Sequence, residues 1–427
     1  MKCQFQCIEP QDLALRDSNP ISALHNATMT KQKVVICGAG IGGLAAALAC
    51  QRAGWQVDVL ERAEQFSHIG AGIQLGPNVT RILQAWGLGR ALSEVAAFPS
   101  QLQVRDAISG AELGRLRLGE HAVQRYGAPY ATVHRGDAHQ VLLDAVKRCP
   151  DIALHHGVAA SGYTETADAV QVTSTQGREW PGDMLLGADG VWSALREWLL
   201  ADGKPVPTGH LAYRALIAQK DLPESLRSQH VTAWLGPNMH MVQYPVQSGD
   251  YLNVVAIVHE PAGKAWDMTD WDHAAQADSI RNHLAHTCCP VQDLIHAIDH
   301  WRLWVLHGRL PMQSAAEHAR GRVALLGDAA HPMFPYLAQG AGMAIEDAAT
   351  LGACLLAQGQ TVPQQLQAFA QARWQRNARV QARSARNGQI FHSRGIMALG
   401  RNLAMRALGE RLLDVPWLYD GPRPRVA

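Results

Sequence analysis

Two patterns of hydrophobic and polar positions alternate along the chain. From residue 33 onward a β-branched run at 34–36 leads through glycines into an alanine-rich helix at 44–52, and a second strand follows at 57–60. A strand–helix–strand unit of this kind predicts a parallel sheet covered by helices.

Between residues 180 and 320 polar and apolar residues alternate instead, which is typical of antiparallel strands with one buried face. Four strands are predicted there, at 211–218, 230–235, 239–245 and 251–258. Turn residues join them at Gly236-Pro237-Asn238 and Ser248-Gly249-Asp250.

The α/β pattern returns with a strand at 322–328 and a helix at 342–357. We therefore predict an α/β fold class: a Rossmann-like domain interrupted by an antiparallel-sheet (α+β) domain and followed by a C-terminal helical region. The predicted bounds are 31–105, 130–200 and 315–362 for the first domain, 106–129 and 201–314 for the second, and 363–427 for the helical region.

The two ends of the chain give fewer signals. Residues 1–30 have neither helical nor strand periodicity, so we expect a disordered extension. Near the other end Pro416, Pro422 and Pro424 are predicted to end regular structure.

Composition narrows the class of protein. The 427 residues, 47% hydrophobic and 18% charged, suit two packed domains, and a net charge of +1 gives no field that would attract nucleic acid. Eight cysteines form no C-x-x-C pair and no zinc-finger spacing, so no metal site is predicted. Without a secretory segment, a cytoplasmic location with reduced thiols is expected.

One nearly uncharged stretch, 34–50, reaches the lower length limit of a membrane span. It carries glycines at phosphate-binding spacing and lacks flanking aromatic residues, so a buried strand–turn–helix is favoured and no membrane association is expected.

The glycines of that stretch form a dinucleotide fingerprint. Gly38, Gly40 and Gly43 fit G-x-G-x-x-G between the first strand and its helix, whose N-terminus favours a pyrophosphate. Glu61 ends the second strand, 23 residues after Gly38, where a carboxylate can accept hydrogen bonds from ribose hydroxyls. Arg62 beside it is a further cofactor-binding candidate. The fingerprint does not distinguish FAD from NAD.

Two more motifs follow apolar strands. GADGVWSALR at 187–196 has the form D-G-x-x-S-x-x-R, and GDAAHP at 327–332 continues into PYLAQGAGMAIEDA at 335–348. An aspartate at a strand end can bind a sugar-like hydroxyl, and a Pro–Gly loop lets a flat ring approach the backbone. The N-terminus of the following helix favours the negative charge of a reduced flavin.

Together the three motifs resemble the single-component FAD-dependent aromatic-ring hydroxylases, in the branch of salicylate hydroxylase and 3-hydroxybenzoate 6-hydroxylase. Other segments agree, and the resemblance covers roughly residues 32–420. These segments are GAGIQLGPN at 70–78, His134-Arg135, Ala212-Tyr213-Arg214 and Trp417-Leu418-Tyr419.

This resemblance implies roles for individual residues. Gly38, Gly40 and Gly43 would surround the pyrophosphate of FAD, and Glu61 would hold the adenosine ribose. Arg135 would contact the phosphate–ribitol region.

In the other two motifs, Asp189 would lie near FAD and the path of the nicotinamide donor, and Asp328 after Gly327 would bind the ribityl chain. Pro332 and Gly340 would line the flavin ring.

Three nearby residues have a structural interpretation. Arg196 is expected to form an ion pair, His331 to pack behind the loop, and Tyr419 to pack in the interior.

The resemblance also implies a reaction: NADH or NADPH reduces bound FAD, and one atom of molecular oxygen is transferred to a small phenolic acid of the 3-hydroxybenzoate or salicylate type. NADH is weakly favoured, and its binding is transient because the chain has no second glycine-rich fingerprint. We expect a monomer or a homodimer.

A group that deprotonates or orients the phenol is expected on the strand at 210–217. Alternation sends Tyr213 and Arg214 to opposite faces, and Tyr213 is favoured as the catalytic residue ahead of His210. His240 and Gln243 on a neighbouring strand are further candidates.

Two alternatives remain open. One is a flavin-dependent dehydrogenase or reductase of a larger hydrophobic substrate. The other is a nucleic-acid or partner-binding protein, because nine arginines between 373 and 411 are accompanied by a single acid, Glu410. Such a run more often marks a solvated face or intramolecular ion pairs.

Overall fold

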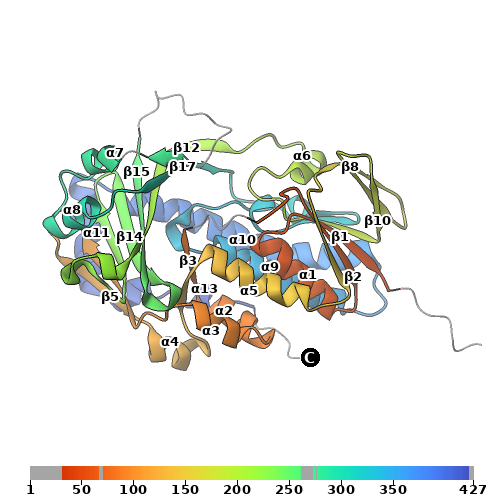
Figure 1. Cartoon of the computed structure of the whole chain (residues 1–427), viewed down its shortest axis with the longest axis horizontal. Helices are drawn as coiled ribbons and strands as arrows, with labels where there is room; N and C mark the ends of the chain where they lie inside the picture. Colours follow the sequence, from red (N-terminus) through yellow and green to blue (C-terminus); the bar gives the residue numbers. More distant parts are fainter. Residues whose placement is uncertain (1–30, 67–70, 261–272, 276, 423–427) are drawn as a thin grey trace, which may run out of the picture. The chain divides into compact units, whose positions relative to one another are not determined.

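A computed structural model describes residues 31–66, 71–260, 273–275 and 277–422 (Figure 1). The extension predicted at 1–30 and Pro424 lie outside the described residues. No helix within the described residues is long and apolar enough to cross a membrane.

One sheet holds the strands that precede all three motifs. Every neighbouring pair in it is parallel except β18 with β19. The strand order is β18 (Ala319–Arg320), β19 (Val323–Leu325), β11 (Met184–Gly187), β1 (Lys33–Cys37), β2 (Gln56–Glu61) and β7 (Ile152–His156). Because β19, β11 and β1 are adjacent and parallel, their carboxyl ends lie at the same edge of the sheet.

Both faces of this sheet are buried, which explains the continuous apolar runs in its strands. Val34 and Ile36 pack against the helices α1 (Ile41–Arg52), α5 (Arg135–Lys147) and α9 (Gly340–Leu355). Val35 faces the opposite side, in a cluster with residues of a three-stranded sheet. That sheet consists of β10 (Glu179–Gly182), β9 (Val170–Ser174) and β8 (Ala160–Glu165). The strand–turn–helix predicted for 34–50 is therefore confirmed.

The second large sheet contains all four strands predicted between 211 and 258. Its pairs are antiparallel except β13 with β4. The order is β16 (His273–Ala275), β17 (Trp301–Gly308), β12 (Val206–Ala218), β15 (Tyr251–His259), β14 (Met239–Val246), β13 (Val231–Gly236), β4 (Gln101–Asp106) and β5 (Glu112–Arg117). β4 begins before the domain boundary placed at residue 106, and the division into domains stays a prediction.

One face of this sheet packs against helices α7 (Ala277–His283) and α8 (Cys289–His296). A smaller sheet, β3 (Gly72–Leu75) with β6 (Ala131–His134), joins the two large ones. Gly72 lies so close to Asn253 of β15 that its backbone N–H donates to the Asn253 side chain at 2.6 Å.

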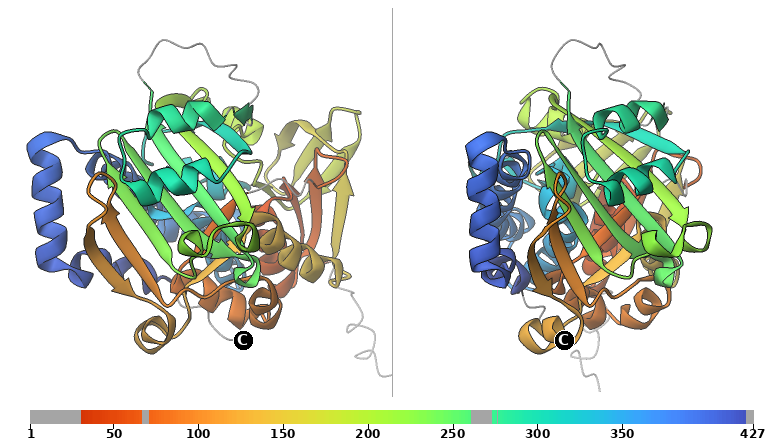
Figure 2. Two further views of the ribbon diagram at one scale, coloured as in Figure 1. Left: turned by 60° about the vertical axis from the view of Figure 1, so that its left-hand side comes forward. Right: turned by 90° about the vertical axis from the view of Figure 1, so that its left-hand side faces the viewer.

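The remaining α-helices within the described residues fall into two groups along the sequence, one between residues 77 and 200 and one after residue 361. They are α2 (Pro77–Ala85), α3 (Gly89–Val95), α4 (Gly119–Tyr126) and α6 (Ala194–Leu200), followed at the end of the chain by α10 (Val362–Phe391), α11 (Gly395–Leu408), α12 (Glu410–Leu413) and α13 (Pro416–Tyr419). α10 packs on α9, and α11 lies beside β5 (Figure 2).

The C-terminal helical region is confirmed, but the prediction for Pro416 was wrong. This proline begins α13 instead of ending regular structure, because the first N–H groups of a helix need no intrahelical partner.

Candidate active site

A cavity of about 310 Å³ lies between the motif-bearing edge of the first sheet and the face of the second sheet opposite α7 and α8. The first side contributes Gly40, Arg135, Ala188, Gly190, Gly327, Asp328 and Gly340, among others. The second side contributes Arg214, His240, Val242, Tyr244, Val255, Ile257 and Trp304.

The three fingerprint glycines have different physical roles. A Cβ at Gly43 would lie 1.9 Å from the carbonyl oxygen of Gly38, and one at Gly38 would lie 2.4 Å from that of Ala188. Glycine is therefore required at both positions, because the neighbouring backbone leaves no room for a side chain. At Gly40, no described atom comes within 4 Å of the added Cβ, although Gly40 is the N-cap of α1. The open side of Gly40 at the helix N-terminus suits a pyrophosphate.

Glu61 is held beside this turn by two backbone hydrogen bonds. Its Oε2 accepts from the N–H of Ala39 at 2.8 Å, and its Oε1 accepts from the N–H of Ala63 at 2.9 Å. Each carboxylate oxygen retains acceptor capacity for a ribose hydroxyl. Arg62 is exposed and is not among the residues that line the cavity.

The second motif presents an acceptor that lacks a partner. Asp189 Oδ2 accepts from the N–H of Leu195 at 3.2 Å, whereas Oδ1 is buried and has no hydrogen-bond partner among the described residues. Burial raises the pKa of Asp189, and a hydrogen bond from Ser193 opposes that shift. A buried acceptor without a partner is costly, so Oδ1 suits a donor group on a bound ligand.

Arg196 of the same motif has the structural role predicted for it. Its side chain pairs with Asp202 at 2.6 Å and donates to the carbonyl oxygens of Ala329 and Ala330. These bonds tie the second motif to the third.

In the third motif, Asp328 lines the cavity and is exposed to it. Burial raises the pKa of Asp328, and the electrostatic influence of the nearby His331 and Arg135 opposes the rise. An added Cβ at Gly340 would lie 3.9 Å from Asp328 Oδ1. Asp328, Arg135 and Gly340 are thus brought together from distant parts of the sequence.

The prediction for Pro332 needs correction. Met333, Phe334 and Pro335 line the cavity, whereas Pro332 does not, and its carbonyl oxygen accepts from Gln381 of α10 at 3.1 Å. The loop turns inward just before this proline because His331 is fully buried and bonded to Asp347 at 2.5 Å.

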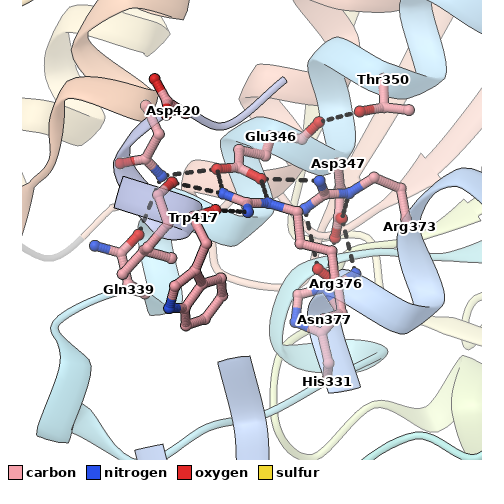
Figure 3. Close-up of polar contacts among 12 residues, drawn as sticks. His331, Gln339, Glu346, Asp347, Thr350, Arg373, Arg376, Asn377, Trp417 and Asp420 are labelled. Carbon is pink, nitrogen blue, oxygen red and sulfur yellow. Dashed lines mark hydrogen bonds and ion pairs between the residues drawn. The ribbon is translucent and has the colours of Figure 1, made fainter. Parts of the chain in front are cut away.

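Asp347 is the centre of a buried charge network behind the loop (Figure 3). Its Oδ2 also accepts from the N–H of Gly327 at 3.0 Å, and its Oδ1 accepts from Arg373 Nε at 2.8 Å and from Asn377 at 3.0 Å. Burial alone would raise the pKa of Asp347, but His331 and Arg373 outweigh it and hold that pKa well below its ordinary value.

Glu346 extends this network toward the end of the chain. It accepts from Arg373 at 2.8 Å, from Arg376 at 2.7 Å and from Asn78 at 2.7 Å. Arg376 also donates to the carbonyl oxygens of Trp417 and Leu418, both at 2.8 Å. These contacts explain part of the arginine run as intramolecular ion pairs.

A metal is not indicated at the nearby group of His318, His331 and Asp347, whose candidate ligand atoms lie within 4.8 Å of one another. His318 Nδ1 is bonded to the carbonyl oxygen of Leu325, and its Nε2 is bonded to Asn377, both at 2.8 Å. Because Asp347 is bonded to Arg373 as well, these atoms already have partners.

The structure corrects the choice of Tyr213. Its side chain is 1% exposed, lies on the face packed against α7 and is bonded to Ser279 Oγ at 2.8 Å. Arg214, on the opposite face, lines the cavity with its guanidinium carbon 3.5 Å from the ring centroid of Trp304. Alternation predicted the opposite faces of these two residues, but no feature of the sequence indicated which face α7 covers.

The other candidate catalytic residues also differ in whether they line the cavity. His240 lines the cavity, whereas Gln243 lies on the other face of β14 and accepts from Trp234 at 3.2 Å. His210 lines a second, adjoining cavity of about 540 Å³. Phe334 borders both cavities.

Comparison with known proteins agrees with this geometry. Residues 31–384 match the family described as FAD binding domain. The chain belongs to this family and is an FAD-dependent monooxygenase of the aromatic hydroxylase class.

Its relatives include 3-hydroxybenzoate 6-hydroxylase of Polaromonas naphthalenivorans, 38% identical over 90% of this chain and 95% of the relative. Another is 6-hydroxynicotinate 3-monooxygenase of Bordetella bronchiseptica, 39% identical over 75% and 82%. A similar solved structure is Klebsiella pneumoniae HpxO complexed with FAD and uric acid, with a TM-score of 0.78, 27% identity and coverage of 90% and 94%.

Gly40 and Gly43 offer a matched pair of substitutions. We expect Gly40→Ala to leave the free energy of unfolding of the apoprotein within about 1 kcal/mol of wild type, since the Cβ meets no protein atom, but to weaken FAD binding about tenfold or more. Gly43→Ala should instead destabilise the apoprotein itself. Urea unfolding and flavin titration measure both, and equal effects of the two variants on unfolding would contradict these roles.

Arg373→Leu should lower the free energy of unfolding by about 3–5 kcal/mol, because it leaves two buried carboxylates without their shared cation. The control is Arg90→Leu, which removes an ion pair of a 92% exposed side chain and should change stability by less than about 0.5 kcal/mol. Urea unfolding of the FAD-loaded proteins measures both. A loss below about 1 kcal/mol for Arg373→Leu would contradict the importance of the network.

Proposed function

We propose that the protein hydroxylates a small, single-ring phenolic acid, with NAD(P)H as electron donor and molecular oxygen as oxidant. The observation that carries this proposal is the composition of the cavity: one wall is the motif-bearing edge, and the opposite wall presents Arg214 stacked on Trp304. A guanidinium on an aromatic face is suited to a flat ring that bears a carboxylate.

The residues of the first wall suit FAD. Gly40 would admit the pyrophosphate, Glu61 the ribose and Asp328 the ribityl chain, while Asp189 Oδ1 offers an acceptor that has no partner in the protein. When bound, FAD supplies the redox chemistry and the activation of oxygen. The protein itself binds and orients the ring and keeps water away from it.

The second wall would orient the substrate. Arg214 binds the carboxylate, and the apolar side chains of Val242, Val255 and Ile257 cover the ring. A cavity of about 310 Å³ that also receives the flavin ring has room for one small ring, which favours a hydroxylase over the alternative of a dehydrogenase for a larger hydrophobic substrate.

Among possible substrates we favour 3-hydroxybenzoate. Three relatives named 3-hydroxybenzoate 6-hydroxylase are 33–38% identical and cover at least 90% of the chain. Salicylate is a second candidate, because a structure titled salicylate hydroxylase substrate complex has a TM-score of 0.78 at 25% identity, covering 92% of this chain and 96% of that one. NADH as donor, a cytoplasmic location, and a monomer or homodimer stay predictions.

The first test is a panel of hydroxybenzoates and hydroxypyridine carboxylates with the FAD-loaded protein. We expect 3-hydroxybenzoate to accelerate NADH consumption and to yield a product that gains one oxygen and keeps its carboxyl group. Loss of the carboxyl group with salicylate would support the second candidate instead. A folded protein that takes up no added flavin would contradict the proposal.

Arg214→Met tests the carboxylate site. It should weaken binding of the preferred hydroxybenzoate about 10–100-fold, because a charge-assisted hydrogen bond in a cavity contributes about 1.5–3 kcal/mol. The corresponding hydroxybenzamide, which lacks the negative charge, is the control and should bind both proteins within about threefold. Flavin difference spectra give both dissociation constants, and equal weakening for acid and amide would exclude a carboxylate-specific role.

A further inference from the structure

Two histidines form a hydrogen bond across the wall between the two cavities. His240 of β14 lines the first cavity and is 3% exposed. Its Nδ1 lies 2.8 Å from Nε2 of His392, which follows α10 and lines the second cavity. The pair is therefore a continuous polar path through a wall otherwise formed here by aromatic side chains: the rings of Tyr336 and Phe391 pack on His240 at 5.2 and 5.4 Å.

The path continues toward the surface. The ring centroid of His392 lies 5.2 Å from that of His210, and His210 lies 5.3 Å from His259, which is exposed. Nδ1 of His392 and Nδ1 of His210 are both buried without a hydrogen-bond partner among the described residues. Orphaned nitrogens in neighbouring rings suit a bridging water.

The two hydrogen-bonded histidines, His240 and His392, are held uncharged. Burial lowers the pKa of His240 well below its ordinary value, and the neighbouring His392 and His210 lower it further. Burial also lowers the pKa of His392 to about 3, with His210, His259 and Arg401 contributing. Tyr336, which packs on both rings, has its pKa raised by burial and stays neutral too.

A neutral imidazole can accept a proton on one nitrogen while it donates from the other. In His240, Nδ1 is used by the bond to His392, which leaves Nε2 as the nitrogen that can accept from a ligand in the first cavity. The pair therefore has the chemistry of a proton relay as well as that of a structural hydrogen bond.

We propose that the phenolic proton of the substrate leaves the first cavity through His240 and His392 to the second cavity. This inference rests on the proposed function. The phenol O–H bond breaks and Nε2 of His240 takes the proton. The Nδ1 proton of His240 passes to Nε2 of His392, and His392 releases its Nδ1 proton to water or to His210. The same path in reverse returns a proton when the hydroxylated product regains its O–H group.

In this assignment His240 is a catalytic residue and His392 a positioning residue that acts through it. A purely structural pair would need only an acceptor at position 392, to hold the N–H of His240. Glutamine provides that acceptor but cannot carry a proton onward, whereas phenylalanine provides neither. His392→Gln therefore separates the two roles, and His392→Phe is its reference.

The probe is 3-hydroxy-4-nitrobenzoate, whose phenolate absorbs visible light. The FAD-loaded protein with this phenol bound is jumped to higher pH in a stopped-flow instrument, and the appearance of bound phenolate is followed. We expect His392→Gln and His392→Phe both to slow this step about tenfold or more. Binding of 3-hydroxybenzoate should change by less than about threefold, and flavin reduction by NADH should be unaffected.

His307→Gln is the matched control. His307 is a partly buried histidine on β17 that packs on Trp192 and lines neither cavity, so its substitution should leave the deprotonation rate at the wild-type value. His240→Gln interrupts the path from its inner side and tests it independently if a variant at 392 does not fold. Free imidazole added to His392→Ala should partly restore the rate.

A wild-type deprotonation rate in folded His392→Gln would overturn the relay and leave the proposed function standing. Failure of any hydroxybenzoate to stimulate NADH consumption in the wild-type protein would instead count against the function itself. The two failures are therefore distinguishable.

Discussion

The buried charge network on α9 and α10 is the interaction on which the site depends. Two adjacent carboxylates, Glu346 and Asp347, are completely buried and are stable as anions only because Arg373, Arg376 and His331 surround them. The same carboxylates fix the backbone of Gly327 and, through Arg376, the last helix of the chain. Burial of charge in this arrangement gives the loop one well-defined conformation.

That conformation gives the first cavity its shape. His331 is buried and bonded to Asp347, and the residues that follow it, Met333 to Pro335, line the cavity. Asp328, which precedes His331, lines it as well. The other two motifs lie at the same edge of the sheet, because they follow β1 and β11, which are parallel neighbours of β19. One wall of the cavity is therefore the motif-bearing edge of the first sheet, with Asp328 and Arg135, and the facing wall presents Arg214 among apolar side chains.

The facing sheet also places polar side chains among the apolar residues of the cavity wall. Arg214 is accommodated on the ring of Trp304, and His240 is accommodated by His392. In both cases a side chain that would be costly to bury alone has a specific partner. Arg214 and His240 thus place polar groups in a wall that is otherwise rich in apolar side chains, an arrangement typical of sites that bind small ligands.

The three motifs and the strands that carry them are predictable from local sequence, because glycine conformation, β-branched runs and alternation act over a few residues. Alternation likewise predicts that Tyr213 and Arg214 face opposite ways. Long-range packing, in contrast, is what places α7 over Tyr213, keeps Pro332 out of the cavity while Pro335 lines it, and brings His240 to His392. Periodicity fixes the orientation of residues relative to one another, whereas the face that becomes buried depends on partners far away in the sequence.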